Sequence, residues 1–266
     1  MKVLAEGTWF DKFLFELPGE IYVSFIIVFI VLILGIIISI KARKTDPFAK
    51  PKGLMNAVEI LVSGVDNLTE SAMGPRFKSL SPYFLTVGIF IFLNFMIGLV
   101  GLPTPTSVLV VPLVLSLMTV ILIHATSIKY SGWGYFKRYT EPVIAFLPMN
   151  LISQVAPLIS LTMRLFGNTV AGWAIMGLVY WALEMLSTAI FGGLIAGGAA
   201  SIWLAPLITP WLHLYFDLFS GFIQTYVFMM LSMMFISQEG PDDDEVPTKE
   251  ITDKAGNKIT ILAKEN

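Results

Sequence analysis

The sequence has no cysteine and few charged residues. None of its 266 residues is a cysteine, and only 14% are Asp, Glu, Lys or Arg. The missing cysteines exclude disulfide bonds and thiol chemistry. The low charge bears on the fold class, because soluble domains carry about 25% charged residues. Nothing in the composition indicates nucleic-acid binding.

The charged residues are also clustered, and long apolar runs lie between them. These runs cover residues 21–40, 83–128, 142–163, 165–183 and 185–216. A membrane-spanning helix needs roughly 20 apolar residues. The runs are continuous rather than alternating, which excludes a β-barrel. The sequence therefore predicts an all-α polytopic membrane protein whose N-terminus is not a cleavable signal.

Five membrane crossings are predicted, with a lead before them and a tail after them. The lead is residues 1–19, and the tail is residues 237–266. The predicted spans are residues 20–42, 82–102, 107–129, 141–191 and 201–236. The last two spans are long and are separated by a glycine-rich break, so they are expected to form a tilted antiparallel hairpin.

Residues 53–75 differ from the spans, because apolar and polar side chains separate onto opposite faces of a helix. The apolar stripe consists of Leu54, Val58, Leu61, Val62, Val65, Leu68 and Ala72. This pattern predicts an amphipathic helix that lies on the membrane surface. The alternative is a helix packed on a soluble domain, but the sequence contains no such domain.

The distribution of Lys and Arg predicts the orientation. Seven lie within residues 41–78 and three within residues 129–138, whereas the other two connections have none. Short basic loops stay on the cytoplasmic side. The N-terminus is therefore expected outside and the tail in the cytoplasm. The tail contains an acidic run at residues 242–245 and a possible hairpin around residues 254–258, and we favour a solvated tail.

One arginine lies deep within the apolar sequence. Arg164 is separated from its nearest ionisable neighbours, Glu141 and Glu184, by about twenty residues on each side. Arginine keeps its proton in proteins, and a charge at bilayer depth costs roughly 2.5–3.5 kcal/mol. Small and polar residues share its helical face, namely Ser153, Ser160, Asn168 and Ala171. Such a strip would let another helix approach closely.

The last predicted helix carries its own polar face, made of Thr209, His213, Asp217, Ser220 and Gln224. These groups are costly in a bilayer unless they are hydrated or paired. In an antiparallel hairpin, Arg164 is level with Gln224, and Asp217 lies slightly farther out. The ionisable groups then form a ladder from the outer surface to Arg164, which suits an aqueous half-channel for a cation. The alternative is a polar seam that joins two helices.

Two segments resemble one protein family. SLTMRLFGNTVAG, residues 160–172, is similar to the signature of subunit a of F-type ATP synthases, and HLYFDLFSGFIQTYVFMMLSMMFI, residues 213–236, is similar to its last helix. The resemblance implies a non-catalytic subunit of the bacterial cell membrane without cofactor or metal. It also implies two offset half-channels that carry H⁺ or Na⁺ to and from a rotating ring of c subunits. The expected partners are this c-ring, the b-subunit peripheral stalk and the rest of the ATP synthase.

The resemblance also implies roles for single residues. Arg164 matches the fixed stator charge that favours ionisation of the facing c-subunit carboxyl and prevents a short circuit between the half-channels. Gln224 matches the glutamine beside this arginine, and Asn168 matches the asparagine one turn on. Ser160 matches a small hydroxyl residue one turn before the arginine.

The sequence departs from the family pattern at two places. Trp173 stands where many members have an acid or a histidine, and Ile97 stands where an acid often follows Asn94. Because tryptophan cannot relay a proton, the outer relay is expected to run through Asp217. Further outer half-channel candidates are His213, Glu184 and Tyr180, and the inner candidates are Gln154 and Ser153.

Two other functions stay open at this level. A stand-alone channel or secondary transporter could use Arg164 to bind an anion, but the sequence lacks the internal repeat that such transporters usually have. A membrane enzyme is the second alternative. No HExxH or GxSxG motif occurs, and GGLIAGG lacks the lysine and hydroxyl of a phosphate-binding loop. The sequence does not distinguish H⁺ from Na⁺.

Overall fold

The structure is a computed structural model that describes residues 18–44, 53–132, 147–191, 204–240, 248–252 and 258–262. Most of the predicted lead, the glycine-rich break at residues 192–198 and the acidic run at residues 242–245 lie outside the described residues. Within the described part, five helices are long and apolar enough to cross a membrane. The predicted all-α polytopic architecture is confirmed.

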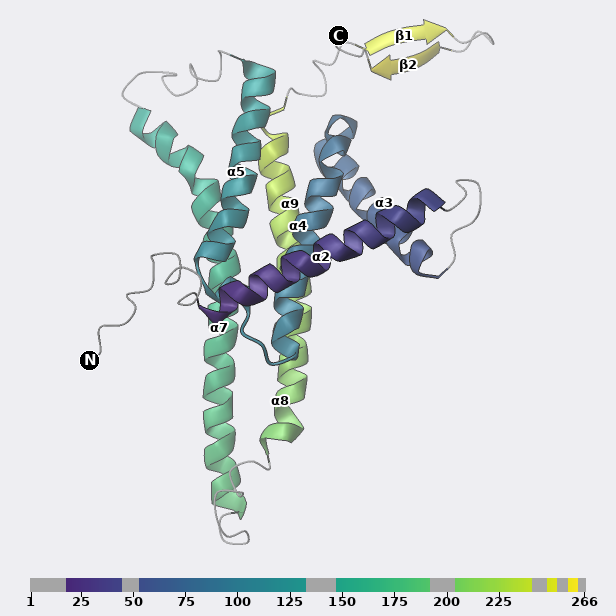
Figure 1. The fold of residues 1–266 in the computed structure, drawn as a ribbon. Helices are drawn as coiled ribbons and strands as arrows, with labels where there is room; N and C mark the ends of the chain where they lie inside the picture. Colours follow the sequence, from purple (N-terminus) through teal and green to yellow (C-terminus); the bar gives the residue numbers. More distant parts are fainter. Residues whose placement is uncertain are drawn as a thin grey trace, which may run out of the picture.

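The first span, α2 (Gly19–Lys44), lies oblique to the other long helices in Figure 1. Its first turn contains Glu20 and its last turn contains basic residues. This placement of charge stabilises both ends of the helix dipole. Only Val23 and Ile27 are buried, so most of the apolar surface of α2 is left for lipid or another chain.

Helix α3 (Leu54–Met73) is the amphipathic helix expected from the sequence. Its C-terminal part packs on the bundle, where Thr69 and Met73 are buried. Its N-terminal part leaves Leu54 and Leu61 exposed. The helix stops at Gly74, whose φ of 84° is favourable only for glycine.

Helices α4 (Ser81–Leu99) and α5 (Val110–Ser131) form the next two spans. The helix α4 ends before the predicted residue 102, because Gly101 has a φ of 80° that an α-helix cannot contain. The helix α5 begins later than the predicted residue 107, because Pro105–Ser107 forms a separate 3₁₀ turn. This turn contributes Ser107 to the lining of the candidate functional site.

The last two spans form an antiparallel hairpin. One arm is α7 (Leu147–Phe191), and the other contains α8 (Ala205–His213) and α9 (Ser220–Ser237); they run side by side in Figure 1. At 1.5 Å per residue, the 45 residues of α7 span about 67 Å, twice the roughly 30 Å of a hydrocarbon core. Such a helix is either strongly tilted in a bilayer or extends beyond the hydrocarbon core. The N-terminal part of α7 bends in Figure 1, and Pro157 lies within it.

One prediction for this hairpin is wrong. The sequence predicts one continuous α-helix over residues 201–236, but Leu214–Phe219 form a π-helical segment between α8 and α9. A π turn closes hydrogen bonds five residues apart, so it changes the faces that residues before and after it present. Helical-wheel positions taken across this segment are therefore shifted.

Two buried clusters connect the spans. One lies beside α3 and the other beside α7. The first consists of Met73, Phe77, Phe84, Val120, Ile123, Met233 and Ile236, and the second of Val87, Ile91, Phe95, Leu115, Leu161, Leu165 and Phe228. Leu161 and Leu165 flank Arg164 on α7, so the second cluster fixes the helix face on which the arginine lies.

The tail contains the possible hairpin that the sequence indicated. Strand β1 (Thr248–Thr252) pairs with β2 (Lys258–Leu262) in antiparallel register, with Ile251 opposite Ile259. Figure 1 shows the hairpin apart from the helical bundle.

Candidate functional site

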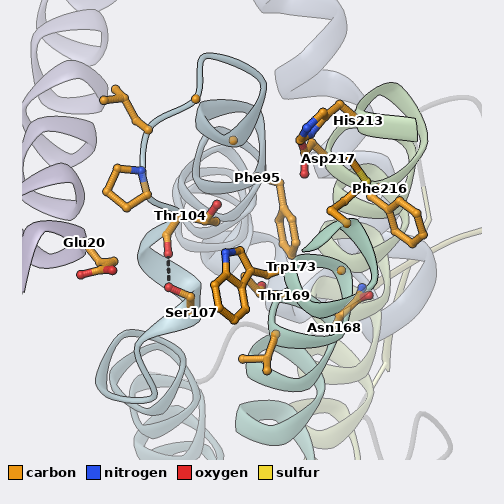
Figure 2. Close-up of a pocket in the computed structure, with 17 residues that line it drawn as sticks. Glu20, Phe95, Thr104, Ser107, Asn168, Thr169, Trp173, His213, Phe216 and Asp217 are labelled. Carbon is orange, nitrogen blue, oxygen red and sulfur yellow. Dashed lines mark hydrogen bonds and ion pairs between the residues drawn. The ribbon is translucent and has the colours of Figure 1, made fainter. Parts of the chain in front are cut away.

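A cavity of about 650 Å³ lies where α2, α4, α7 and the last span meet. The Pro105–Ser107 turn and the residues before it form one wall. Three ionisable residues line the cavity, and they come from both ends of the chain: Glu20, His213 and Asp217. Figure 2 shows Glu20 on the α2 side, across from His213 and Asp217. We call this space the Asp217 cavity.

Three side chains at this cavity form a hydrogen-bonded chain. The Nδ1 atom of His213 lies 2.7 Å from Oδ2 of Asp217, and Nε2 of His213 lies 3.0 Å from the hydroxyl of Tyr180. With its proton on Nδ1, a neutral imidazole donates to the carboxylate and accepts from the phenol. We call these residues the Tyr–His–Asp chain. It can pass a proton between Tyr180, which is exposed, and Asp217 in the cavity.

Helix packing gives Asp217 its position. A Cβ atom on Gly98 of α4 would lie only 3.2 Å from Cγ of Asp217. The carboxylate therefore occupies space that any larger residue at position 98 would take. Close by, Gly221 meets Phe95 so tightly that a Cβ atom would lie 2.5 Å from Cβ of Phe95. These two glycines allow α4 to approach the last span.

Three polar side chains join α7 to the last span. Asn168 donates from Nδ2 to Oγ of Ser220 at 3.2 Å and to Oε1 of Gln224 at 3.3 Å. Ser220 also donates to Oδ1 of Asn168. We call Asn168, Ser220 and Gln224 the amide cluster. Gln224 is only 5% exposed, and its Nε2 donor has no partner within the described part of the chain.

The amide cluster and the cavity agree with the predicted hairpin register, in which Asp217 faces the segment just beyond Asn168. The predicted single polar face of the last span is nevertheless divided. Ser220 and Gln224 meet Asn168, whereas His213 and Asp217 line the cavity. The π-helical segment lies between the two pairs.

Arg164 lies one turn before Asn168 on α7 and is half-buried. Its guanidinium group makes no hydrogen bond or ion pair with any residue that the structure describes. Ser153, Ser160 and Ala171, which share its predicted face, are all exposed. We call these four residues the arginine strip. No helix of the described part of the chain covers this strip.

Other predicted site residues are not brought to the cavity. Glu184 is exposed and does not line it. Ser153 donates its hydroxyl to the carbonyl of Met149 in its own helix, and Gln154 lies in the same turn, away from the cavity. The structure thus gathers His213, Asp217 and Tyr180 but leaves Glu184 and the two inner candidates outside this group.

Sequence reasoning missed the contribution of the first span and of the turn after α4. Glu20, Thr104 and Ser107 all line the cavity with Trp173 (Figure 2). The hydroxyl of Ser107 donates to the carbonyl of Thr104 at 2.8 Å, and Thr106 shares a 2.9 Å hydrogen bond with Thr169 of α7. One feature of the sequence could have identified Glu20, because the predicted topology places it at the same outer side of the membrane as Asp217.

Comparisons with known proteins identify the family. A sequence model described as "ATP synthase A chain" matches residues 21–237. The chain belongs to this family. It is 30% identical to ATP synthase subunit a of Mycoplasmoides gallisepticum over 233 residues, which cover 80% of this chain and 75% of that protein.

Two further relatives have the same name. The chain is 31% identical to ATP synthase subunit a of Mycoplasma pneumoniae, with 81% of this chain and 77% of that protein covered. It is 32% identical to ATP synthase subunit a of Streptococcus agalactiae, with 74% and 81% covered. The chain is therefore a multi-pass plasma-membrane subunit of the membrane sector of an ATP synthase and is not the catalytic subunit. It works with the other subunits of that enzyme.

Proposed function

We propose that this chain is the stator that carries H⁺, with Na⁺ as the alternative ion, through two half-channels to and from carboxyl groups on a ring of c subunits. Ion flow through it is thereby coupled to rotation and to ATP synthesis. The observation that carries the proposal is the arrangement along α7. The Asp217 cavity ends at Asn168, the amide cluster follows, and Arg164 lies one turn farther on with an uncovered strip.

Each group has a separate role in the proposed path. The Tyr–His–Asp chain and the cavity form the outer half-channel. A c-subunit helix packs on the arginine strip, because Ser160 and Ala171 are small and allow a close approach. The positive charge of Arg164 favours the ionised form of the facing carboxyl, since an opposite charge lowers a carboxyl pKa. The proton is then released on the other side.

The amide cluster separates the cavity from Arg164. Gln224 and Asn168 are fixed by their mutual hydrogen bond, so their polar atoms are held beside the path of the carboxyl. The Nε2 donor of Gln224 is buried and has no partner among the described residues, so Gln224 acts by holding Asn168 in place. The inner half-channel runs past Ser153 and Gln154 on the N-terminal part of α7. The N-terminus of the chain lies outside the cell, and the tail lies in the cytoplasm. The b-subunit peripheral stalk is the second partner that binds this helical bundle.

Membrane vesicles that contain the assembled ATP synthase test the proposal. The chain is expected to co-purify with a c-ring, and Arg164→Ala is expected to abolish both ATP synthesis and ATP-driven pumping while the subunit stays assembled. Arg43→Ala, at the exposed end of α2, is the matched control. Normal pumping by Arg164→Ala, or ion transport by the purified chain alone, would contradict the proposal. Measuring pumping with and without Na⁺ separates H⁺ from Na⁺.

A further inference from the structure

We infer that Glu20 is the second carboxylate of the outer half-channel and replaces the acid or histidine that the chain lacks at Trp173. This inference rests on the proposed function and adds to it a residue from the first span. In this role Glu20 accepts a proton from external water and releases it to water in the cavity, from which it reaches Asp217.

The position of Glu20 is fixed by packing. It lies in the first turn of α2 and is half-buried. The preceding residue, Gly19, approaches Pro103, since a Cβ atom there would lie 4.0 Å from Cγ of Pro103. Pro103 belongs to the wall of the Asp217 cavity. The start of α2 therefore rests on the same turn that lines the cavity, and this contact holds the Glu20 carboxylate at the cavity edge.

The chemistry of Glu20 requires water at this place. Its carboxylate makes no hydrogen bond or ion pair with another residue within the described ranges. A carboxylate without a partner is costly in an apolar environment unless it is hydrated. Because Glu20 lines a cavity of about 650 Å³, water can reach it there. The cavity thus has a hydrated acid on the α2 side and a hydrogen-bonded acid, Asp217, on the other.

The path between the two acids is polar on one side and aromatic on the other. Thr104 and Ser107 line it from the turn after α4, and Trp173 lines it from α7 (Figure 2). The indole ring cannot take up a proton, so α7 supplies no relay group at this position. The helix α2 supplies one instead, because its first turn reaches the same cavity. A change of residue on one helix is thereby compensated from another helix.

A purely structural role for Glu20 is the competing explanation, because a glutamate in the first turn stabilises a helix. The experiment separates the two by comparing Glu20→Gln, which keeps the shape, with Glu20→Asp, which keeps the carboxylate. Glu59→Gln is the matched control, since Glu59 is exposed on α3 and does not line the cavity. Asp217→Asn reports on the proposed function itself. Each variant is measured in the assembled complex for subunit content and for ATP-driven pumping.

We expect Glu20→Gln to lower pumping several-fold and to change its dependence on external pH, with normal subunit content. Glu20→Asp should restore most of the rate, and Glu59→Gln should behave like the unmodified protein. If Glu20→Gln pumps normally while Asp217→Asn does not, the inference is wrong and the proposed function stands. If both pump normally, the outer half-channel proposed above is wrong as well. The inference is also overturned if Glu20→Asp or the control Glu59→Gln loses as much pumping as Glu20→Gln.

Chemical labelling gives a readout that helix stability does not affect. Because the chain has no cysteine, Glu20→Cys introduces a single thiol into it. We expect a cationic methanethiosulfonate reagent, added from outside, to modify this thiol and block the remaining pumping. Modification of Thr188→Cys, at an exposed position of α7 that does not line the cavity, should leave pumping unchanged. A Glu20→Cys thiol that reacts without any effect on pumping, or that does not react, contradicts the inference.

Discussion

The Asp217 cavity and the arginine strip lie on the same long helix, yet they are completed in different ways. At the cavity, Nδ1 of His213 lies 2.7 Å from Asp217 and Nε2 lies 3.0 Å from Tyr180. The walls come from α2, α4, the turn after α4, α7 and the last span. At the strip, Arg164 has no partner among the described residues and its small neighbours are exposed. Under the proposed function, a relay can be finished within one chain, whereas a charge that serves a moving partner has to remain open to it.

The largest expected effect tests the open side of this comparison. Arg164→Lys should abolish coupled pumping, because a lysine is a point charge that can lose its proton when it is desolvated. ATP-driven pumping in membrane vesicles measures the effect. Arg43→Lys, at the exposed end of α2, should pump normally. Pumping by Arg164→Lys at the usual rate would mean that the strip needs only a positive charge and not a permanent one.

The second prediction tests the closed side through its packing. Gly221→Ala should destabilise the chain by about 1–3 kcal/mol, the usual range for overpacking. The reason is that the new Cβ atom would lie 2.5 Å from Cβ of Phe95 and 2.8 Å from its Cγ. Thermal unfolding of the complex in detergent measures the change. Gly35→Ala, which has no atom within 4 Å of the new Cβ, is the control. Equal stability of the two variants would show that α4 can move away from the last span without cost.

The third prediction interrupts the Tyr–His–Asp chain. His213→Gln removes the imidazole that joins Tyr180 to Asp217, and pumping should fall roughly tenfold. This loss is smaller than the roughly 10²–10⁴-fold that a proton-transfer group usually contributes, because Asp217 remains in the cavity. The other histidine, His124 of α5, does not line the cavity, so His124→Gln is the control. An unchanged rate for His213→Gln would remove the hydrogen-bonded chain from the path and leave the water in the cavity as the conductor.

The smallest expected effect concerns the support of the cavity wall. Thr106 and Thr169 are buried and share a 2.9 Å hydrogen bond that attaches the turn after α4 to α7. Thr106→Val should destabilise the complex by about 1 kcal/mol. Thr169→Val should destabilise the Thr106→Val variant less than it destabilises the unmodified protein. A double-mutant cycle of thermal stabilities measures this coupling. Additive losses would show that the hydrogen bond does not hold the wall.

The hairpin illustrates how far sequence patterns reach. Its two arms and their register followed from apolar length and from the polar faces, and the Asn168–Ser220 contact agrees with that register. The prediction of a continuous last helix was wrong, because the π-helical segment Leu214–Phe219 has no signal in a 3.6-residue period. That segment matters for the site, since it lies between the residues that face Asn168 and those that line the cavity.

The sequence by itself determined the five spans, the isolated position of Arg164 and the identity of the polar residues beside it. These properties follow from local composition and from the helical period, which need no knowledge of neighbouring helices. Only the tertiary structure decided which polar groups meet. Glu20 joins His213 and Asp217 in one cavity, and Glu184 does not, because the start of α2 packs on the turn after α4 and this turn packs on α7. Such convergence depends on helix crossing and on close approach at Gly98 and Gly221, and no local pattern encodes it.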